Sequence, residues 1–69
     1  MRTYLKEIRE NLGFSQDDVA KKLCLSRSYY SRIELGKRQK RLSLDIMLKL
    51  SEILNVPINT ILESEKKLI

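Results

Sequence analysis

Only three residues, Cys24-Leu25-Ser26, separate two segments whose apolar residues recur with helical spacing. The first segment covers residues 16–23 and the second covers residues 27–35. A connection this short predicts a tight turn between two helices that cross at a steep angle. The small side chain of Ala20 lets the second helix pass close to the first. The sequence therefore predicts that the N-terminal part of the second helix stands free.

Residues that start and stop helices support this pair. Ser15 and Asp18 have the spacing of a capping box at the start of the first helix. Ser26 is the expected N-cap of the second helix, and Gly36 is expected to end it because a left-handed backbone costs glycine little. Tyr30 lies in the inward phase of the second helix, so we expect it in the core.

Two longer helices are predicted on either side of this pair. Thr3 is the expected N-cap of the first helix of the chain, which Gly13 ends. Ser43 is the expected N-cap of a fourth helix, which closes before Pro57. The residues expected on the inner faces of these two helices are Leu5, Ile8, Leu12, Leu44, Met47, Leu50, Ser51 and Leu54.

A short fifth helix is predicted at residues 59–62, and residues 63–69 extend it or fray. The expected fold class is all-α, a compact arrangement of five short helices. A chain of 69 residues is long enough for one domain, so we expect a single domain over residues 1–69 with its core in residues 3–62.

The composition argues against several classes of protein. The chain has one cysteine, Cys24, and no histidine, so it lacks the ligands of a structural zinc site and cannot form an intrachain disulfide. We expect no catalytic residues, no metal, no cofactor and no enzymatic activity. A reduced thiol favours a cytoplasmic protein in which Cys24 is an inert residue rather than a redox sensor. No apolar run exceeds three residues, so we expect no membrane span.

The excess positive charge is confined to one segment. The chain carries 14 basic and 9 acidic side chains, for a net charge of +5. Residues 23–41 hold six of the basic side chains and one acidic side chain, Glu34, while the rest of the chain is balanced. This distribution is typical of a surface that binds a polyanion. The alternative is a solvated loop that aids solubility.

The stretch SQDDVAKKLCLSRSYYSRIELGKR resembles the helix-turn-helix core of the Cro/CI (lambda-repressor-like) DNA-binding domains. LKEIRENLGF before it, and LDIMLKLSEILNVPINTIL after it, are similar to the first, fourth and fifth helices of that family. The residues that carry the resemblance as a set are Arg9, Ser15, Gln16, Val19, Ala20, Ser26, Ile33, Glu34 and Gly36. The resemblance covers residues 3–62 and implies a five-helix DNA-binding domain of bacterial, phage or mobile-element regulators.

The resemblance also implies roles for individual residues. The side chains that would face base edges are Arg27, Ser28, Ser31 and Arg32. The side chains that would contact phosphates or the groove edge are Gln16, Ser26, Tyr29, Lys37, Arg38, Lys40 and Arg41. Arg9 and Glu34 would form a partly buried ion pair between the first and third helices. Cys24 stands where the family usually has glycine, and a left-handed backbone there would cost on the order of 1 kcal/mol.

Our leading hypothesis is a sequence-specific regulator of transcription that binds double-stranded DNA, with repression as the expected effect. One domain reads only a few base pairs, so we expect a homodimer on a palindromic operator, with half-sites about 34 Å apart. The candidates for the dimer surface are Ile58, Ile61, Leu62, Leu68 and Ile69, which could instead complete the monomer core. The alternative function is a protein-interaction module, a bridging or anti-repressor protein whose basic face binds an acidic partner. A regulatory protein partner is compatible with either hypothesis.

Overall fold

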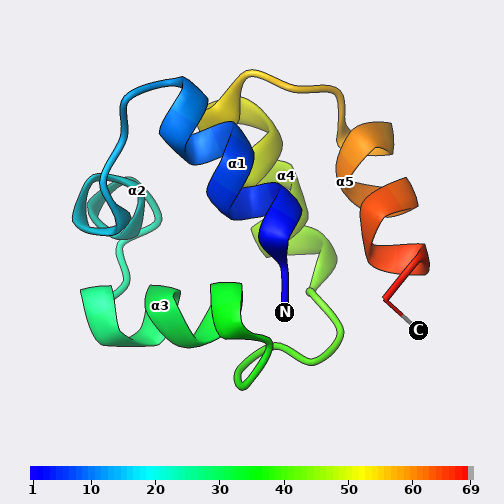
Figure 1. Cartoon of the computed structure of the whole chain (residues 1–69), viewed down its shortest axis with the longest axis horizontal. Coiled ribbons are helices and arrows are strands. Elements are labelled where there is room, and N and C mark those ends of the chain that lie inside the picture. Colours follow the sequence, from blue (N-terminus) through cyan, green and yellow to red (C-terminus); the bar gives the residue numbers. More distant parts are fainter. Residues whose placement is uncertain (69) are drawn as a thin grey trace.

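The computed structural model describes residues 1–68, and these residues form five α-helices without a β-strand. The helices are α1 (Thr3–Asn11), α2 (Gln16–Lys22), α3 (Arg27–Leu35), α4 (Leu44–Leu54) and α5 (Ile58–Lys66). α2 and α3 pack against each other, α1 contacts α3, and α4 packs against α5. Figure 1 shows α3 along one edge of the molecule, with the N-terminus close to the end of α3. The predicted all-α fold with five helices is confirmed.

Three serines start helices as the sequence predicts. The hydroxyl groups of Ser15, Ser26 and Ser43 accept hydrogen bonds from the backbone N–H three residues later. At Ser15 the capping box is complete, because Ser15 N donates to Asp18 Oδ2 at 2.8 Å and Asp18 N donates to Ser15 Oγ at 3.0 Å. The prediction that Thr3 is an N-cap is wrong. Thr3 is the first residue of α1, and the N-cap is Arg2, whose side chain is engaged elsewhere.

Four helices are followed by a residue with a left-handed backbone. These residues and their φ angles are Gly13 (76°), Cys24 (59°), Gly36 (79°) and Asn55 (55°). At the end of α2, Leu25 N donates to Ala20 O at 2.9 Å and Cys24 N donates to Lys21 O at 3.1 Å. This pair of bonds defines a Schellman motif with Cys24 at the left-handed position. The motif turns the chain sharply enough for α3 to begin three residues later.

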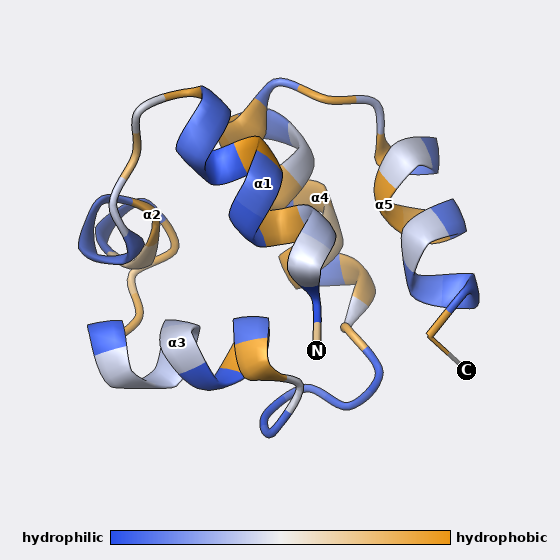
Figure 2. Ribbon diagram, in the orientation of Figure 1, coloured by the Kyte–Doolittle hydropathy of each residue, from blue (hydrophilic) through white to orange (hydrophobic). Residues whose placement is uncertain are grey.

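The core lies between the inner faces of the helices. Its buried apolar residues are Leu5, Val19, Ala20, Leu23, Tyr30, Ile33, Leu42, Met47, Leu50, Leu54 and Ile61. The apolar parts of the ribbon in Figure 2 gather on the inward sides of the helices. Two predicted core positions are wrong, because Leu12 is 45% exposed and Leu44 is 61% exposed. Leu12 follows the last residue of α1 and Leu44 is the first residue of α4, so both lie where the helical surface leaves the core.

The fifth helix is longer than the predicted segment 59–62. It begins at Ile58, directly after Pro57, and continues to Lys66, so most of the predicted tail extends it. Ile61 is fully buried, and Ile58 and Leu62 pack against the core. The apolar side of α5 therefore completes the monomer core. The expectation that Ile61 contributes to a dimer surface is wrong, because its side chain is fully buried in the monomer. Of the other candidates for that surface, Leu68 is 49% exposed. Ile69 lies outside the described residues.

Candidate nucleic-acid interface

A buried ion pair fixes α3 relative to α1. Arg9 Nε donates to Glu34 Oε2 at 2.7 Å and Arg9 Nη2 donates to Glu34 Oε1 at 3.3 Å, and both side chains are less than one-tenth exposed. Arg9 Nη1 also donates to Phe14 O at 2.9 Å, which ties in the turn before α2. Because the guanidinium group is planar and forked, it can bind the carboxylate and a carbonyl at once. The pair therefore holds α1 against α3 and ties both helices to the turn that leads into α2.

The carboxylate of Glu34 has further neighbours. Gln16 Nε2 donates to Glu34 Oε1 at 3.1 Å. Burial opposes ionisation of Glu34, but the hydrogen bonds from Arg9 and Gln16 outweigh it and hold the pKa of Glu34 below its usual value. Burial, followed by the nearby Glu34 carboxylate, raises the pKa of Tyr30, whose hydroxyl has no hydrogen-bond partner among the described residues. Glu34 is thus an ionised acceptor and Tyr30 a neutral core residue.

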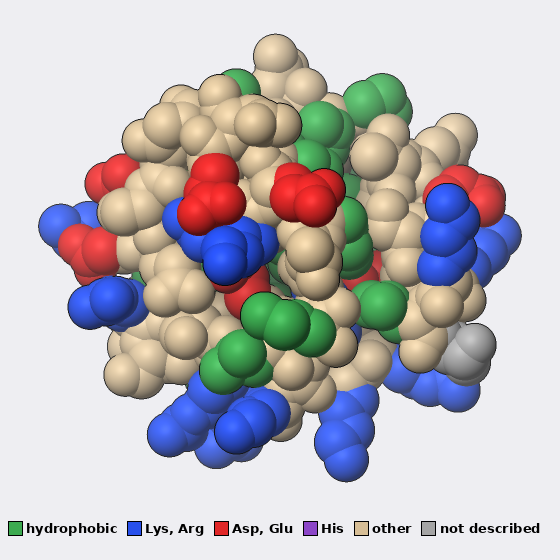
Figure 3. All heavy atoms as spheres, viewed as in Figure 1, with side chains coloured by type: hydrophobic (Ala, Val, Ile, Leu, Met, Phe, Trp, Pro, Cys, Tyr) green, Lys and Arg blue, Asp and Glu red, His purple; other side chains and the backbone are tan. Residues whose placement is uncertain are grey.

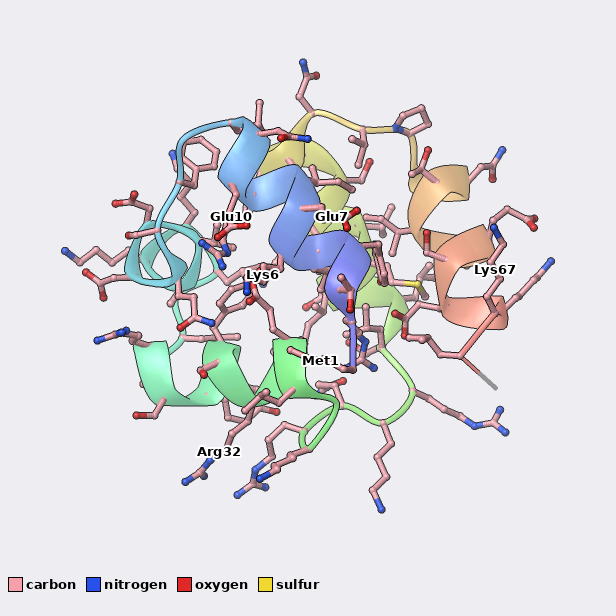
Figure 4. All side chains as sticks on the ribbon, in the orientation of Figure 1. Met1, Lys6, Glu7, Glu10, Arg32 and Lys67 are labelled. Carbon is pink, nitrogen blue, oxygen red and sulfur yellow. The ribbon has the colours of Figure 1, made fainter. Side chains whose placement is uncertain are left out.

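The exposed face of α3 forms one wall of a hollow of about 330 Å³. The residues that line the hollow are Gln16, Arg27, Ser28, Ser31, Arg32, Leu35 and Lys37. All four side chains predicted to face base edges are in this list, and so are two of those predicted to contact phosphates. Arg27, Ser28 and Arg32 are exposed and Ser31 is half-buried. Figure 4 shows the Arg32 side chain extending away from the body of the molecule.

The basic loop, residues 37–42, follows α3 and is folded around Gln39. Gln39 has a φ of 54°, in the left-handed region that non-glycine residues rarely adopt. Gln39 Nε2 donates to Tyr29 Oη at 3.1 Å, and Gln39 Oε1 accepts from Ser43 N at 3.3 Å. The Gln39 side chain therefore links α3 to the start of α4 across the loop. Tyr29, predicted at the groove edge, supports the loop through this hydrogen bond. The Arg38 guanidinium lies over the Tyr29 ring, with Arg38 Cζ 5.8 Å from the centre of the ring.

Six cationic side chains lie along one edge of the molecule. Figure 3 shows Lys and Arg side chains at the edge formed by α3 and the basic loop, and others at the sides and in the middle of this face, next to Asp and Glu side chains. Figure 4 shows Glu7 and Glu10 of α1 on this face, with Lys6 near them. The exposed basic residues of α3 and the loop are Arg27, Arg32, Lys37, Arg38, Lys40 and Arg41. None of the six is in an ion pair with another residue of the described chain.

Arg2 is a buried charged residue that sequence reasoning missed. Its side chain is 2% exposed, and its guanidinium group donates to Glu65 of α5, to Ile33 O of α3 and to the backbone of the basic loop. These partners lie 31 to 63 residues away along the chain. Local spacing therefore gives no signal for this contact. The one available hint is a positive charge directly before an amphipathic helix.

Other chemistry is not indicated by the described residues. Among residues 1–68, no three His, Cys, Asp or Glu side chains are grouped closely enough to hold a metal ion. Of the five helices, none combines the length and the apolar character that crossing a membrane requires. Cys24 is exposed at the turn between α2 and α3. The exposed basic side chains of α3 and the basic loop form a surface with positive charge, which is complementary to an anion.

Comparison with known proteins gives two matches. A helix-turn-helix family model matches residues 5–61 of the chain. The uncharacterized HTH-type transcriptional regulator YqaF of Bacillus subtilis (strain 168) is 46% identical to the chain over 39 residues. Those residues are 56% of this chain and 51% of YqaF, so the match spans about half the length of the relative. No solved structure matches the chain significantly.

Proposed function

The chain belongs to the helix-turn-helix family of DNA-binding regulators, and from this premise we propose that it binds double-stranded DNA sequence-specifically to regulate transcription. The observation that carries the proposal is the cationic edge: six exposed basic side chains on α3 and the basic loop have no acidic partner in the described chain. Phosphate groups of a duplex would supply the missing anions. We infer a cytoplasmic location, where bacterial DNA is found.

In this proposal α3 lies in the major groove, which is wide enough to admit an α-helix. Arg27 is at the free N-terminal end of α3, where family resemblance puts the first contact with bases. Its guanidinium group is suited to bind guanine O6 and N7 together, and such a contact discriminates against other bases by about 1–3 kcal/mol. Arg32 lies more than one turn further along, and Ser28 and Ser31 offer hydroxyl groups between them.

The phosphate contacts in this proposal come from both ends of the hollow. Lys37, Arg38, Lys40 and Arg41 are exposed on the basic loop and would follow the DNA backbone, supplying affinity that falls with salt. At the other end, Gln16 would donate to a phosphate through the N–H that does not bind Glu34. The Ser26 hydroxyl accepts from Tyr29 N and can still donate its own hydrogen to a phosphate.

The finer parts of the proposal are repression, a palindromic operator and a homodimer. A single α3 reads only a few base pairs, and two copies related by a two-fold axis would read twice as many. Leu68, two residues after the end of α5, is exposed and is compatible with a contact between copies. Occupying an operator would repress transcription by excluding other proteins from the same DNA.

A second candidate function is a protein-interaction module whose basic face binds an acidic partner. The same cationic edge favours it, because a protein carboxylate surface would also supply anions. The exposed Arg27 and Ser28 at the start of α3 favour DNA instead. The basic loop alone supplies the positive charge that an acidic protein partner needs, so such a partner would not require Arg27 and Ser28 as well.

The test is selection of bound sequences from a pool of random duplexes. The proposal expects enrichment of a single motif, and two-fold symmetry in that motif would establish the palindrome and the dimer together. Enrichment of an asymmetric motif would contradict the homodimer but support sequence-specific binding. No enrichment over several rounds at low salt would contradict the proposed function and leave the protein-interaction module as the better account.

A further inference from the structure

Arg2 joins three parts of the structure that are far apart in sequence. Its Nε donates to Glu65 Oε2 at 2.9 Å, its Nη1 donates to Ile33 O at 2.7 Å and to Arg38 O at 3.3 Å, and its Nη2 donates to Gln39 O. The backbone N–H of Arg2 also donates to Glu34 O at 2.7 Å. One residue therefore binds carbonyl groups at the end of α3, carbonyl groups of the basic loop, and the last turns of α5.

Burying a guanidinium group is unfavourable unless its charge and its N–H groups are matched. Arg2 is 2% exposed, and Glu65 supplies the opposite charge. The Tyr4 hydroxyl also donates to Glu65 Oε2, so this carboxylate oxygen accepts hydrogen bonds from both Arg2 and Tyr4. Lysine could pair with Glu65, but its single ammonium group lacks the planar fork that also reaches three carbonyl oxygens. The site is built for arginine.

Two of the carbonyl groups that Arg2 binds belong to the basic loop. Arg38 O and Gln39 O both point inward to the guanidinium group. Gln39 is at a φ of 54°, a conformation that persists only where surrounding contacts hold it. With these two carbonyl groups turned inward, the side chains of Arg38 and Lys40 are exposed on the outside of the loop.

We propose that Arg2 is a positioning residue for DNA binding, which holds the basic loop in the conformation that presents its cations to phosphates. This inference rests on the proposed function. Arg2 itself is buried and does not touch DNA; it acts through Arg38, Gln39 and Lys40. Glu65 orients Arg2, so the last turns of α5 stabilise a loop that lies at the DNA-binding edge.

The test compares Arg2→Lys with the wild type in titrations of a duplex at several salt concentrations. The substitution keeps the net charge, so a change in binding reports the loop geometry rather than the number of charges. We expect the variant to lose about one phosphate contact, which weakens binding about tenfold at 0.1 M salt and makes the slope of log K against log salt shallower by about one. Backbone NMR order parameters of residues 37–42 should fall in the variant.

A variant with a destabilised core separates positioning from stability. Ile61→Val removes one methyl group from a fully buried residue of α5 and should lower the melting temperature without changing the salt slope. If Arg2→Lys does not fold, Glu65→Gln takes its place, because it leaves the carbonyl contacts of Arg2 available and removes the ion pair. Its net charge is higher by one, which alone would strengthen binding to a duplex, so weaker binding would report the loop geometry. We expect Glu65→Gln to weaken binding to the duplex and to reduce the salt slope less than Arg2→Lys does.

The outcomes are distinguishable. If the wild type binds no duplex at low salt, the proposed function fails, and the positioning role fails with it. If the wild type binds and Arg2→Lys binds with the same affinity, slope and loop order, only the positioning role is overturned. It is also overturned if Ile61→Val changes the slope as much as Arg2→Lys does, or if neither Arg2→Lys nor Glu65→Gln folds, since Arg2 would then serve folding alone.

Discussion

Arg9 Nε lies 2.7 Å from Glu34 Oε2, and this contact joins α1 to α3. Glu34 is on the inner side of α3, and Arg27 and Arg32 of the same helix are exposed. A rigid helix transmits the orientation of its buried side to its exposed side. The direction of the exposed side chains of α3 is thus set in part by a buried salt bridge.

Removing one partner of this pair should destabilise the fold strongly. Arg9→Met leaves the buried Glu34 carboxylate without its counter-ion, and we expect a loss of about 3–5 kcal/mol in the free energy of unfolding. Urea denaturation followed by circular dichroism measures it. The double variant Arg9→Met/Glu34→Leu should recover part of the loss because no isolated charge remains. A double variant as unstable as the sum of the single variants would contradict a direct interaction.

Stability should fall on acidification. The pKa of Glu34 is lower in the folded protein than in the unfolded chain, so the stabilisation is complete above the unfolded pKa and is lost as the pH falls through the folded pKa. Urea unfolding between about pH 7 and pH 2 measures this loss. Glu34→Gln should flatten the profile, leaving a residual dependence from Asp18, whose pKa the hydrogen bonds from Ser15 lower. A profile that Glu34→Gln leaves unchanged would assign the acid sensitivity to other groups.

Residues on α3 and on the basic loop should have different effects on specificity. Arg27→Ala should reduce the preference for the selected duplex over a random duplex by about 1–3 kcal/mol, because it removes a contact with base edges. Lys40→Ala should weaken binding to both duplexes alike and reduce the salt slope by about one. Fluorescence anisotropy with both duplexes measures the four affinities. Identical behaviour of the two variants would contradict the division between base contacts and phosphate contacts.

The turn between α2 and α3 can be made more stable. Cys24 holds a left-handed backbone at a φ of 59°, which costs a residue with a side chain about 1–2 kcal/mol. Cys24→Gly removes this strain, and after the greater entropy of glycine in the unfolded chain is subtracted, we expect a gain of about 0.5–1 kcal/mol. Cys24→Ala retains the strain and is the matched control. Equal stabilities of the two variants in urea denaturation would show that the turn stores no strain.

Much of the fold could be predicted because the determinants are local. Ser15, Ser26 and Ser43 cap helices, and Gly36 ends one, through contacts that span three or four residues. The length of α5 was underestimated because its last turn is polar, without an apolar pattern to mark it.

The site was predictable only in part. Family resemblance supplied the exposed residues of α3 and the basic side chains of the loop. It did not supply the conformation of the loop, which depends on Arg2 and Gln39. The partners of Arg2 come from α3, the loop and α5, and such contacts emerge only after the helices are packed. A buried arginine whose partners are mostly carbonyl groups leaves no periodic pattern in the sequence.

The proposed function requires α3 and the basic loop to bind a duplex of defined sequence. The most direct measurement is the affinity of the wild type for the selected duplex and for a scrambled duplex of the same composition, at increasing salt. We expect the selected duplex to bind at least about 10³-fold more tightly, and log K to fall linearly with log salt for both duplexes. Equal affinity for the two duplexes, or no binding to either at the lowest salt, would contradict it.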